Sequence, residues 1–121
     1  MKNESHGLII KKYWLNKIFS DNPKTWEIRG SRTKRRGKIQ LIESGSGNIV
    51  GECKLVDCIG PLSDSEIEQN RSKHQIADDF DISYKNVFAW VLSDAKRYAN
   101  PVPYEHPQGA VIWVKLDSPS L

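Results

Sequence analysis

Residues 22–38 read Asn22-Pro23-Lys24-Thr25-Trp26-Glu27-Ile28-Arg29-Gly30-Ser31-Arg32-Thr33-Lys34-Arg35-Arg36-Gly37-Lys38. From Lys24 to Lys38 this segment contains seven Lys or Arg residues and a single carboxylate, Glu27. Because the whole chain has a formal net charge of only +3, the positive charge is concentrated here. A local excess of cations attracts polyanions, and phosphates that bind to it release counterions. Nucleic acid is therefore the first partner that the segment indicates.

The start of this segment has the alternation of a β-strand. Over residues 25–29, Trp26 and Ile28 fall on one face, whereas Thr25, Glu27 and Arg29 fall on the other. The apolar face predicts a core contact. A carboxylate and a guanidinium on one strand face can form a surface ion pair worth about 0–1 kcal/mol. They can also bind the donors and acceptors of a nucleobase edge, and Lys24 can reach the same place.

Length and composition indicate one soluble domain over residues 1–121, and the strands and helices predicted along it make its class α+β. Residues 117–121 are expected to be a frayed tail. Apolar residues make up 38% and charged residues 27% of the chain, which is ordinary for a globular protein. No apolar run approaches the roughly 18 residues of a membrane span, and the first residues lack a signal-peptide core. We therefore expect a cytoplasmic protein that does not bind membranes.

The cysteines and histidines give little sign of a metal or redox centre. Cys53 and Cys58 lie five residues apart in one predicted strand, so they should face opposite ways and stay reduced. His6, His74 and His106 are scattered, without a partner at metal-ligand spacing. We expect neither a metal nor a cofactor, and a catalytic Cys–His pair is disfavoured because a free Cys in a strand is usually a small buried apolar residue.

Hydrophobic periodicity predicts a small antiparallel sheet with helices beside it. Strands are predicted at residues 8–10, 38–42 and 49–59, a helix at 13–19, and a hairpin turn at 45–48. Gly51 is predicted to mark a bulge that lets the sheet curl. Ser63 and Glu66 have the spacing of a capping box for a polar helix that runs to about residue 74 and borders a cleft.

The rest of the chain is predicted as a loop, two strands and a connector. Residues 78–81 suggest the loop, residues 87–92 a strand, and residues 100–103 an extended connector with two prolines. The last strand is predicted at residues 109–116. Its alternation places four apolar residues on one face, namely Ala110, Ile112, Val114 and Leu116.

Five motifs in order resemble the ASCH domain, the activating-signal-cointegrator homology family of the PUA-like superfamily. Lys24-x-x-Glu27-x-Arg29 is similar to the family's Lys-x-x-Glu-x-Arg signature. The other four motifs are Tyr13-Trp14, Arg36-Gly37, Gly51-x-x-x-Leu55-x-Asp57-Cys58, and the late pair Phe88-x-Trp90 and Gly109-x-x-x-Trp113. The likeness extends over nearly the whole chain.

This resemblance implies a small curled mixed or antiparallel β-barrel with two or three flanking helices. It also implies a cleft lined by Lys24, Glu27 and Arg29. Members are mostly regarded as RNA-related, and some cleave RNA or remove an acyl group from a modified cytidine. In the deacylating branch a Thr nucleophile occupies the position that Glu27 has here.

Deacylation by a catalytic triad with a Thr nucleophile is not expected here. The carboxylate of Glu27 is a poor replacement for a hydroxyl that a neighbouring amine activates. Thr25 is displaced by two residues from the nucleophile position. Glu66 or Glu68 is the candidate for the helix-borne carboxylate of that triad. The usual Gly before the signature Lys is replaced by Asn22-Pro23.

Three functions remain open at this point. In the first, Lys24, Glu27 and Arg29 bind a base or nucleotide in the cleft of an RNA-binding module. The residues predicted to hold phosphates are Arg32, Lys34, Arg35, Arg36 and Lys38; those predicted to stack on a base are Tyr13 and Tyr104, with Trp26 as another candidate.

The second function is an RNA-processing enzyme, either a ribonuclease or a modified-nucleoside hydrolase. In this reading Glu27 is the general base and Lys24 or Arg29 stabilises the developing charge. The third is a module that docks proteins and leaves the basic segment solvated. The partners expected for the first two are RNA, single-stranded nucleic acid or a modified nucleoside, and the oligomeric state is left open.

Overall fold

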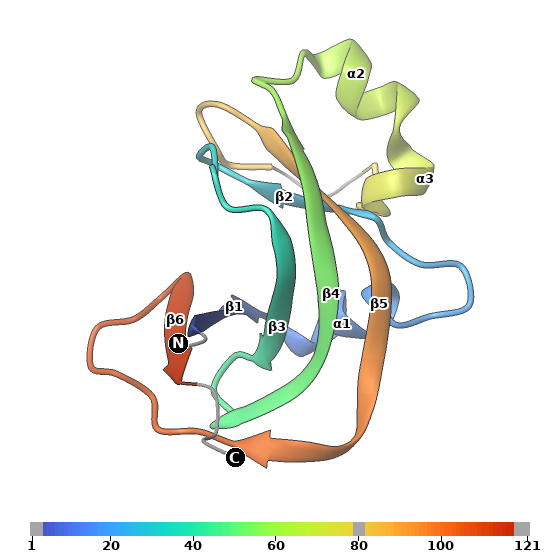
Figure 1. Ribbon diagram of the computed structural model, residues 1–121. Coiled ribbons are helices and arrows are strands. Elements are labelled where there is room, and N and C mark those ends of the chain that lie inside the picture. Colours follow the sequence, from blue (N-terminus) through green and yellow to red (C-terminus); the bar gives the residue numbers. More distant parts are fainter. Residues whose placement is uncertain (1–3, 79–81, 118–121) are drawn as a thin grey trace.

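The computed structural model describes residues 4–78 and 82–117, which form one six-stranded sheet with three short helices (Figure 1). The strand order is β2-β5-β4-β3-β1-β6. The strands are β1 (Glu4–Ile10), β2 (Trp26–Arg29), β3 (Gly37–Glu43), β4 (Asn48–Ile59), β5 (Phe88–Pro103) and β6 (Trp113–Asp117). The helices are α1 (Lys12–Ile18), α2 (Asp64–Gln69) and α3 (Arg71–His74).

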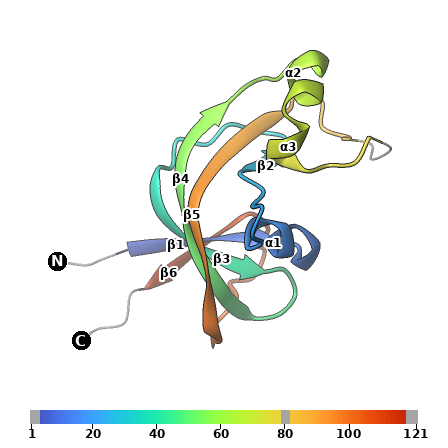
Figure 2. The same cartoon turned by 90° about the vertical axis from the view of Figure 1, so that its right-hand side faces the viewer.

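The sheet is strongly curled because its two longest strands, β4 and β5, bend together along their whole length (Figure 1). Figure 2 shows α1, β2 and α3 on the concave side of this curve. The register between β4 and β5 shifts at three places, and such irregularities increase strand bending. The curl therefore creates a hollow that β2 and α1 can border.

The sheet is mixed and open, which refines the sequence prediction. β1 pairs with β3 in parallel, because α1 and β2 intervene and bring the chain back in the same direction, whereas the other pairs are antiparallel. Over the described residues β2 and β6 each pair on one side only. The predicted α+β class and curled sheet are confirmed, but the sheet does not close into a barrel.

The core confirms the alternation predicted for β2. Trp26 and Ile28 are buried in one apolar cluster with Leu62, Ile76, Val87 and Ala89. A larger cluster fills the curl between α1 and the long strands. Cys53 belongs to that larger cluster, Cys58 is half-buried, and both are free thiols as expected.

Gly51 lies at a bulge, as predicted. Leu41 pairs with Gly51 and Ile42 pairs with Ile49, so β4 has one extra residue at this point. A Cβ atom at Gly51 would lie 2.5 Å from the ring of Phe19, at the end of α1. Glycine therefore allows the helix to approach the curled sheet closely.

The capping box is also present. The Ser63 hydroxyl accepts from the Glu66 N–H, while the Glu66 carboxylate accepts from the Ser63 N–H. The helix predicted to reach residue 74 is divided at Asn70 into α2 and α3. None of the α2 residues is buried, in agreement with its polar sequence.

Two predictions near the C-terminal end were wrong. Residues 100–103 belong to β5 and are not a connector, since Asn48 pairs with Pro103. The two prolines are tolerated because β2 pairs with β5 only at residues 88–91, which leaves the later part of β5 as a sheet edge. The last strand begins at Trp113, and Ile112 is 39% exposed, so only Val114 and Leu116 of the predicted apolar face are buried.

The predicted loop at residues 78–81 and the predicted tail at residues 117–121 lie only partly within the described residues. Asp78 lies in a turn, but residues 79–81 of the predicted loop are outside the described residues. Asp117 belongs to β6, whereas residues 118–121 of the predicted tail are likewise outside them. Among residues 4–78 and 82–117, no helix has the length and apolar character needed to cross a membrane.

Candidate nucleotide-binding cleft

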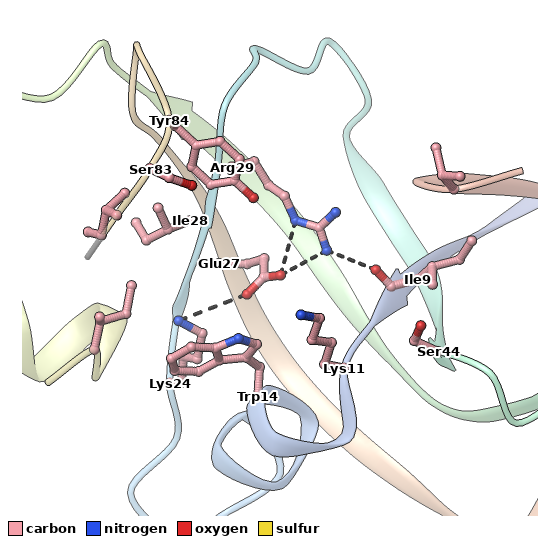
Figure 3. Close-up of a pocket in the computed structure, with 13 residues that line it drawn as sticks. Ile9, Lys11, Trp14, Lys24, Glu27, Ile28, Arg29, Ser44, Ser83 and Tyr84 are labelled. Atoms are coloured by element: carbon pink, nitrogen blue, oxygen red, sulfur yellow. Dashed lines mark hydrogen bonds and ion pairs between the residues drawn. The ribbon is translucent and has the colours of Figure 1, made fainter. Parts of the chain in front are cut away.

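A cavity of about 370 Å³ lies where β2 and α1 meet the ends of β1 and β3 (Figure 3). Three charged side chains of the signature segment line this cavity, namely Lys24, Glu27 and Arg29. The remaining lining residues are Ile9, Lys11, Trp14, Ile28, Ser44, Ile76, Ile82, Ser83, Tyr84 and Val111. The structure thus brings Lys24 together with Glu27 and Arg29, the two charged residues that the alternation of β2 placed on one face.

Glu27 and Arg29 form a close, partly buried ion pair. Arg29 donates to Glu27 Oε2 from Nε at 3.0 Å and from Nη2 at 2.8 Å. Arg29 Nη2 also donates to the carbonyl of Ile9 at 2.8 Å, which ties β2 to β1. Glu27 is only 5% exposed, so the pair is not the solvent-exposed ion pair that was one interpretation of the sequence.

Lys24 is the most buried charge of the cavity, at 2% exposed. Its Nζ donates to the carbonyl of His74 at 2.5 Å, lies 3.9 Å from Glu27 Oε1, and sits 4.6 Å from the ring centre of Trp14. Burial lowers the pKa of Lys24 from 10.5 to about 8; Glu27 opposes this shift, and the nearby cations Lys17 and Arg29 add to it. Lys24 is therefore a cation that loses its proton readily.

Backbone hydrogen bonds hold Lys24 between two helices. The Lys24 N–H donates to Lys17 O at the end of α1, and the Thr25 N–H donates to Lys73 O in α3. His74 fixes the next turn, because its Nδ1 accepts from the Ile76 N–H at 3.0 Å and its Nε2 lies 2.7 Å from Ile67 O. A carbonyl oxygen only accepts, so Nε2 carries the proton and the ring is neutral.

The two oxygens of Glu27 have different environments. Oε2 accepts both hydrogen bonds from Arg29, whereas Oε1 faces Lys24 at 3.9 Å, beyond hydrogen-bonding distance. Figure 3 shows the carboxylate between the two cations, with Trp14 below it and Tyr84 above. The cavity therefore offers a ligand the Oε1 acceptor of Glu27, aromatic rings and three cations, namely Lys11, Lys24 and Arg29.

Sequence reasoning missed several lining residues, of which Trp14 and Tyr84 matter most. Trp14 was noted only as part of a helix and a motif; its spacing of four residues from the buried Ile18 is the signal that could have placed it on the inner side of α1. Tyr84 is 46% exposed and comes from an irregular segment without periodicity, so nothing in the sequence pointed to it.

Both predicted stacking tyrosines lie outside the cavity lining. Tyr13 is on the exposed side of α1, 63% accessible, with its ring edge-to-face against Trp14 at 4.7 Å. Tyr104 packs beside the cluster of Ile42, Ile49, Val114 and Leu116, and its hydroxyl lies 2.6 Å from His106 Nδ1. Trp26, the other stacking candidate, is buried in the core cluster of β2.

The groups considered for a deacylating triad are also absent from the lining. Thr25 does not line the cavity, and its backbone is used to join α3 and β5. Glu66 belongs to the capping box, and Glu68 pairs with Arg71 at 2.8 Å. Neither Glu66 nor Glu68 is among the described residues that line the cavity around Lys24.

The basic loop, residues 30–38, directly follows Arg29 and lies beside the cavity without lining it. Two of its guanidinium groups lie over aromatic rings, Arg32 over Phe88 at 4.9 Å and Arg35 over Trp113 at 4.8 Å. Its other cations are exposed, with Arg36 3.9 Å from Asp57 and Lys38 3.4 Å from Glu52. Lys34 is exposed as well.

A stacked row of side chains joins this loop to the cavity. Trp90 and Trp113 are parallel within 13°, with ring centres 5.7 Å apart. Arg29 lies 5.5 Å from the centre of Trp90, and Arg35 lies 4.8 Å from that of Trp113. The Trp90 indole N–H also donates to Ser31 O at 2.9 Å, so the loop has a fixed start relative to Arg29.

The profile of the ASCH domain matches residues 8–102 of the chain, which include the signature, the basic loop, the whole of β2, β3 and β4, and nearly all of β5. The chain belongs to the ASCH domain family. This family is generally associated with RNA binding. No curated protein sequence matches the chain significantly.

Solved structures of an ASCH protein from Zymomonas mobilis share this ASCH fold. One has a TM-score of 0.70 at 13% identity and covers 93% of this chain and 87% of that chain. Two single-residue variants of the same bacterial protein, a serine-to-alanine and a tyrosine-to-phenylalanine change, each have a TM-score of 0.64 at 14% identity. They cover 93% of this chain and 87% or 89% of theirs. At this identity the likeness supports the fold alone.

Proposed function

We propose that this ASCH domain binds RNA and holds one base in the cavity beside Lys24, Glu27 and Arg29. The observation that carries the proposal is a carboxylate oxygen, Glu27 Oε1, that lies among cations in a 370 Å³ cavity without a hydrogen bond from any described residue. Glu27 keeps 5% of its surface exposed, and an acceptor oxygen that reaches a cavity without a hydrogen bond from the protein suits a ligand N–H. Family membership supports RNA as the class of ligand.

The cavity fits the edge of a base because bases present N–H donors next to carbonyl or ring-nitrogen acceptors. Glu27 Oε1 would accept from an exocyclic or ring N–H, while Lys24 or Lys11 would donate to the neighbouring acceptor. Tyr84, exposed at the cavity, offers a ring on which the base can stack. The arginines of the basic loop would bind phosphates of the same strand.

The test is the affinity of the protein for labelled single-stranded RNA. Glu27→Gln should weaken binding at least tenfold at every salt concentration, because the amide offers one acceptor fewer and adds a donor. Replacement of Arg35 and Arg36 by Ala should instead reduce the slope of log affinity against log salt by about 0.7 per phosphate contact. An unchanged affinity in Glu27→Gln would contradict binding at this cavity.

A second candidate is an RNA-processing enzyme, and the lowered pKa of Lys24 beside Glu27 favours it. In a cleavage reaction Glu27 would take the proton of a ribose 2′-hydroxyl as that oxygen attacks the adjacent phosphorus. Lys24 or Arg29 would stabilise the pentavalent phosphorane, and the 5′-oxygen would leave with a proton from Lys24 or water. The products would be a 2′,3′-cyclic phosphate and a 5′-hydroxyl.

Incubation with end-labelled RNA distinguishes the two candidates. An enzyme should give fragments with cyclic phosphate ends that are lost in Glu27→Gln and in Lys24→Met. If the protein binds the RNA but does not cleave it, the function is that of a binding module. Binding no tighter than that of a control protein of equal net charge would favour the third reading, in which the domain docks protein partners.

A further inference from the structure

The outer side of α1 combines exposed cations with an exposed aromatic ring. Lys12 and Tyr13 are exposed, and Lys17 Nζ lies over the Tyr13 ring at 5.1 Å from its centre. Residues 12 and 16 are four apart, as are residues 13 and 17, so each pair is made of neighbours on the helix surface. We call Lys11, Lys12, Tyr13 and Lys17 the α1 surface.

This surface is continuous with the cavity. Lys11 lines the cavity, as does Trp14, whose ring meets the Tyr13 ring edge-to-face at 4.7 Å. Lys24 lies over Trp14 at 4.6 Å, just as Lys17 lies over Tyr13. Two cation–ring pairs therefore follow one another, the first inside the cavity and the second on the exposed helix.

The charge of this region is strongly one-signed. Residues 11–24 contain four lysines, and Asp21 is their single acidic residue. The first turn of α1 has no acidic side chain, although acidic residues stabilise that end of a helix and lysines do not. Arg97 adds a further cation, since it donates to Asn16 of α1 at 3.0 Å. Lys11 and Lys12 are thus placed against helix stability, which points to a role in binding, whereas Lys17 lies in the last turn, where a cation is favourable.

We propose that the α1 surface binds nucleotides next to the one in the cavity, so that the ligand is a single strand of RNA and not an isolated nucleoside. This inference rests on the proposed function of the cavity. Proteins that bind single strands combine a cationic groove for the backbone with aromatic rings that stack on successive bases. Tyr13 would stack on the neighbouring base while Lys12 and Lys17 contact phosphates.

The position of β2 extends this path in the other direction. β2 begins just after Lys24, which is bonded to the end of α1, and ends at Arg29, where the basic loop starts. The α1 surface and the basic loop therefore lie at opposite ends of β2, with Glu27 between them. A strand that enters along the loop can place one base in the cavity and leave across α1.

The experiment compares ligands of two lengths. Fluorescence anisotropy measures binding of a labelled uridine mononucleotide and of a labelled nine-residue oligouridine, repeated with the other three bases. In the triple variant Lys12→Ala, Tyr13→Ala, Lys17→Ala, the oligonucleotide should bind about tenfold more weakly or worse, since one stack and two phosphate contacts are lost. Mononucleotide affinity should stay within twofold of the parent protein.

A matched control removes two charges elsewhere. Lys96 and Lys115 are exposed, and Lys96 points away from α1 because its neighbour Arg97 points toward it. The double variant Lys96→Ala, Lys115→Ala should bind both ligands as the parent protein does. An equal loss in this control would overturn the inference, because net charge alone would then explain the effect.

The two proposals fail in different ways. If the triple variant binds the oligonucleotide as tightly as the parent protein does, the path across α1 is wrong. The cavity proposal is tested separately, and it holds if Glu27→Gln abolishes mononucleotide binding. If the parent protein binds neither ligand, the proposed function itself is wrong, and the path fails with it. Circular dichroism of the variants confirms that the exposed substitutions leave the fold intact.

Discussion

The cavity charges and the basic loop use the same residue types in opposite surroundings. Lys24 and Glu27 are at most 5% exposed, and each lies within 4 Å of an opposite charge. In the loop, Arg36 and Lys38 are well exposed, and their nearest acidic partners lie at 3.4–3.9 Å. The cavity thus holds a few buried charges, whereas most of the charges in the loop are exposed to solvent.

The difference indicates how specificity and affinity are divided. Removing two charges from water costs several kcal/mol per ion, which the attraction between them only partly offsets. A surface ion pair contributes about 0–1 kcal/mol and is screened by salt. Buried charges persist where they are needed for a function, so we expect the cavity to select the base and the loop to supply general attraction for phosphates.

The largest expected effect is the loss of the buried carboxylate. Glu27→Gln leaves Lys24 and Arg29 near the interior without their anion, which should reduce the free energy of unfolding by about 3 kcal/mol. Urea denaturation at pH 7 measures this change. The matched variant Glu68→Gln, on the exposed side of α2, should stay within about 0.5 kcal/mol. A loss below about 1 kcal/mol in Glu27→Gln would mean that the cavity is effectively solvated.

A second effect concerns the proton of Lys24. With a pKa of about 8, Lys24 is mostly charged at pH 7 and mostly neutral at pH 9. RNA affinity should therefore fall about tenfold between these pH values, equivalent to about 1.4 kcal/mol. Oligoadenosine is the suitable probe because its base does not titrate in this range.

Lys24→Met is the control for this pH dependence. It should bind weakly at pH 7 and show no further loss up to pH 9, because the titrating group is gone. If the RNA affinity of the parent protein does not change between pH 7 and pH 9, the Lys24 ammonium does not contact the RNA.

A smaller effect involves His74 and the stability of the fold at low pH. Burial lowers the pKa of His74, and Lys24 and Arg71 add to this shift, while its bond to Ile67 O and the carboxylate of Glu68 oppose it. The unfolded chain therefore binds a proton before the folded protein does, so stability should be full above pH 6.5 and fall as the pH drops below it.

Thermal denaturation between pH 7 and pH 5 tests this sign. His74→Gln should be less stable at pH 7 but should lose less stability on acidification than the parent protein. An identical pH profile in both proteins would assign the acid sensitivity to other groups.

The smallest effect is expected in the basic loop. Arg36→Ala removes a 3.9 Å ion pair with Asp57 between exposed groups, so unfolding free energy should change by at most about 0.5 kcal/mol. RNA affinity should nevertheless become less dependent on salt, with the slope smaller by about 0.7. A destabilisation of several kcal/mol would show that the loop is structural and would remove the contrast with the cavity.

Local patterns in the sequence were enough to predict much of the fold. The alternation of β2 separated Trp26 and Ile28 from Glu27 and Arg29, and the capping box and the Gly51 bulge each follow from a few adjacent residues. The structure also brings Lys24 to the same place, because Pro23 and the end of α1 leave it at the start of β2.

Long-range features could not be predicted in the same way. The pairing of β1 with β3 and the extension of β5 to Pro103 depend on which strand lies alongside, and no local pattern specifies a neighbour. Tyr84 reaches the cavity from an irregular segment. Tyr13 was expected to stack in the cleft because it is aromatic, yet it faces out because its neighbour Trp14 takes the inward position on α1.

The parallel indoles of Trp90 and Trp113 give this protein a built-in optical reporter. Two rings 5.7 Å apart couple their electronic transitions, and Arg29 and Arg35 cover their outer faces. We expect a ligand that displaces either arginine to change the near-ultraviolet circular dichroism of this pair. The change can be read at the long-wavelength edge of the tryptophan band, where RNA absorbs little.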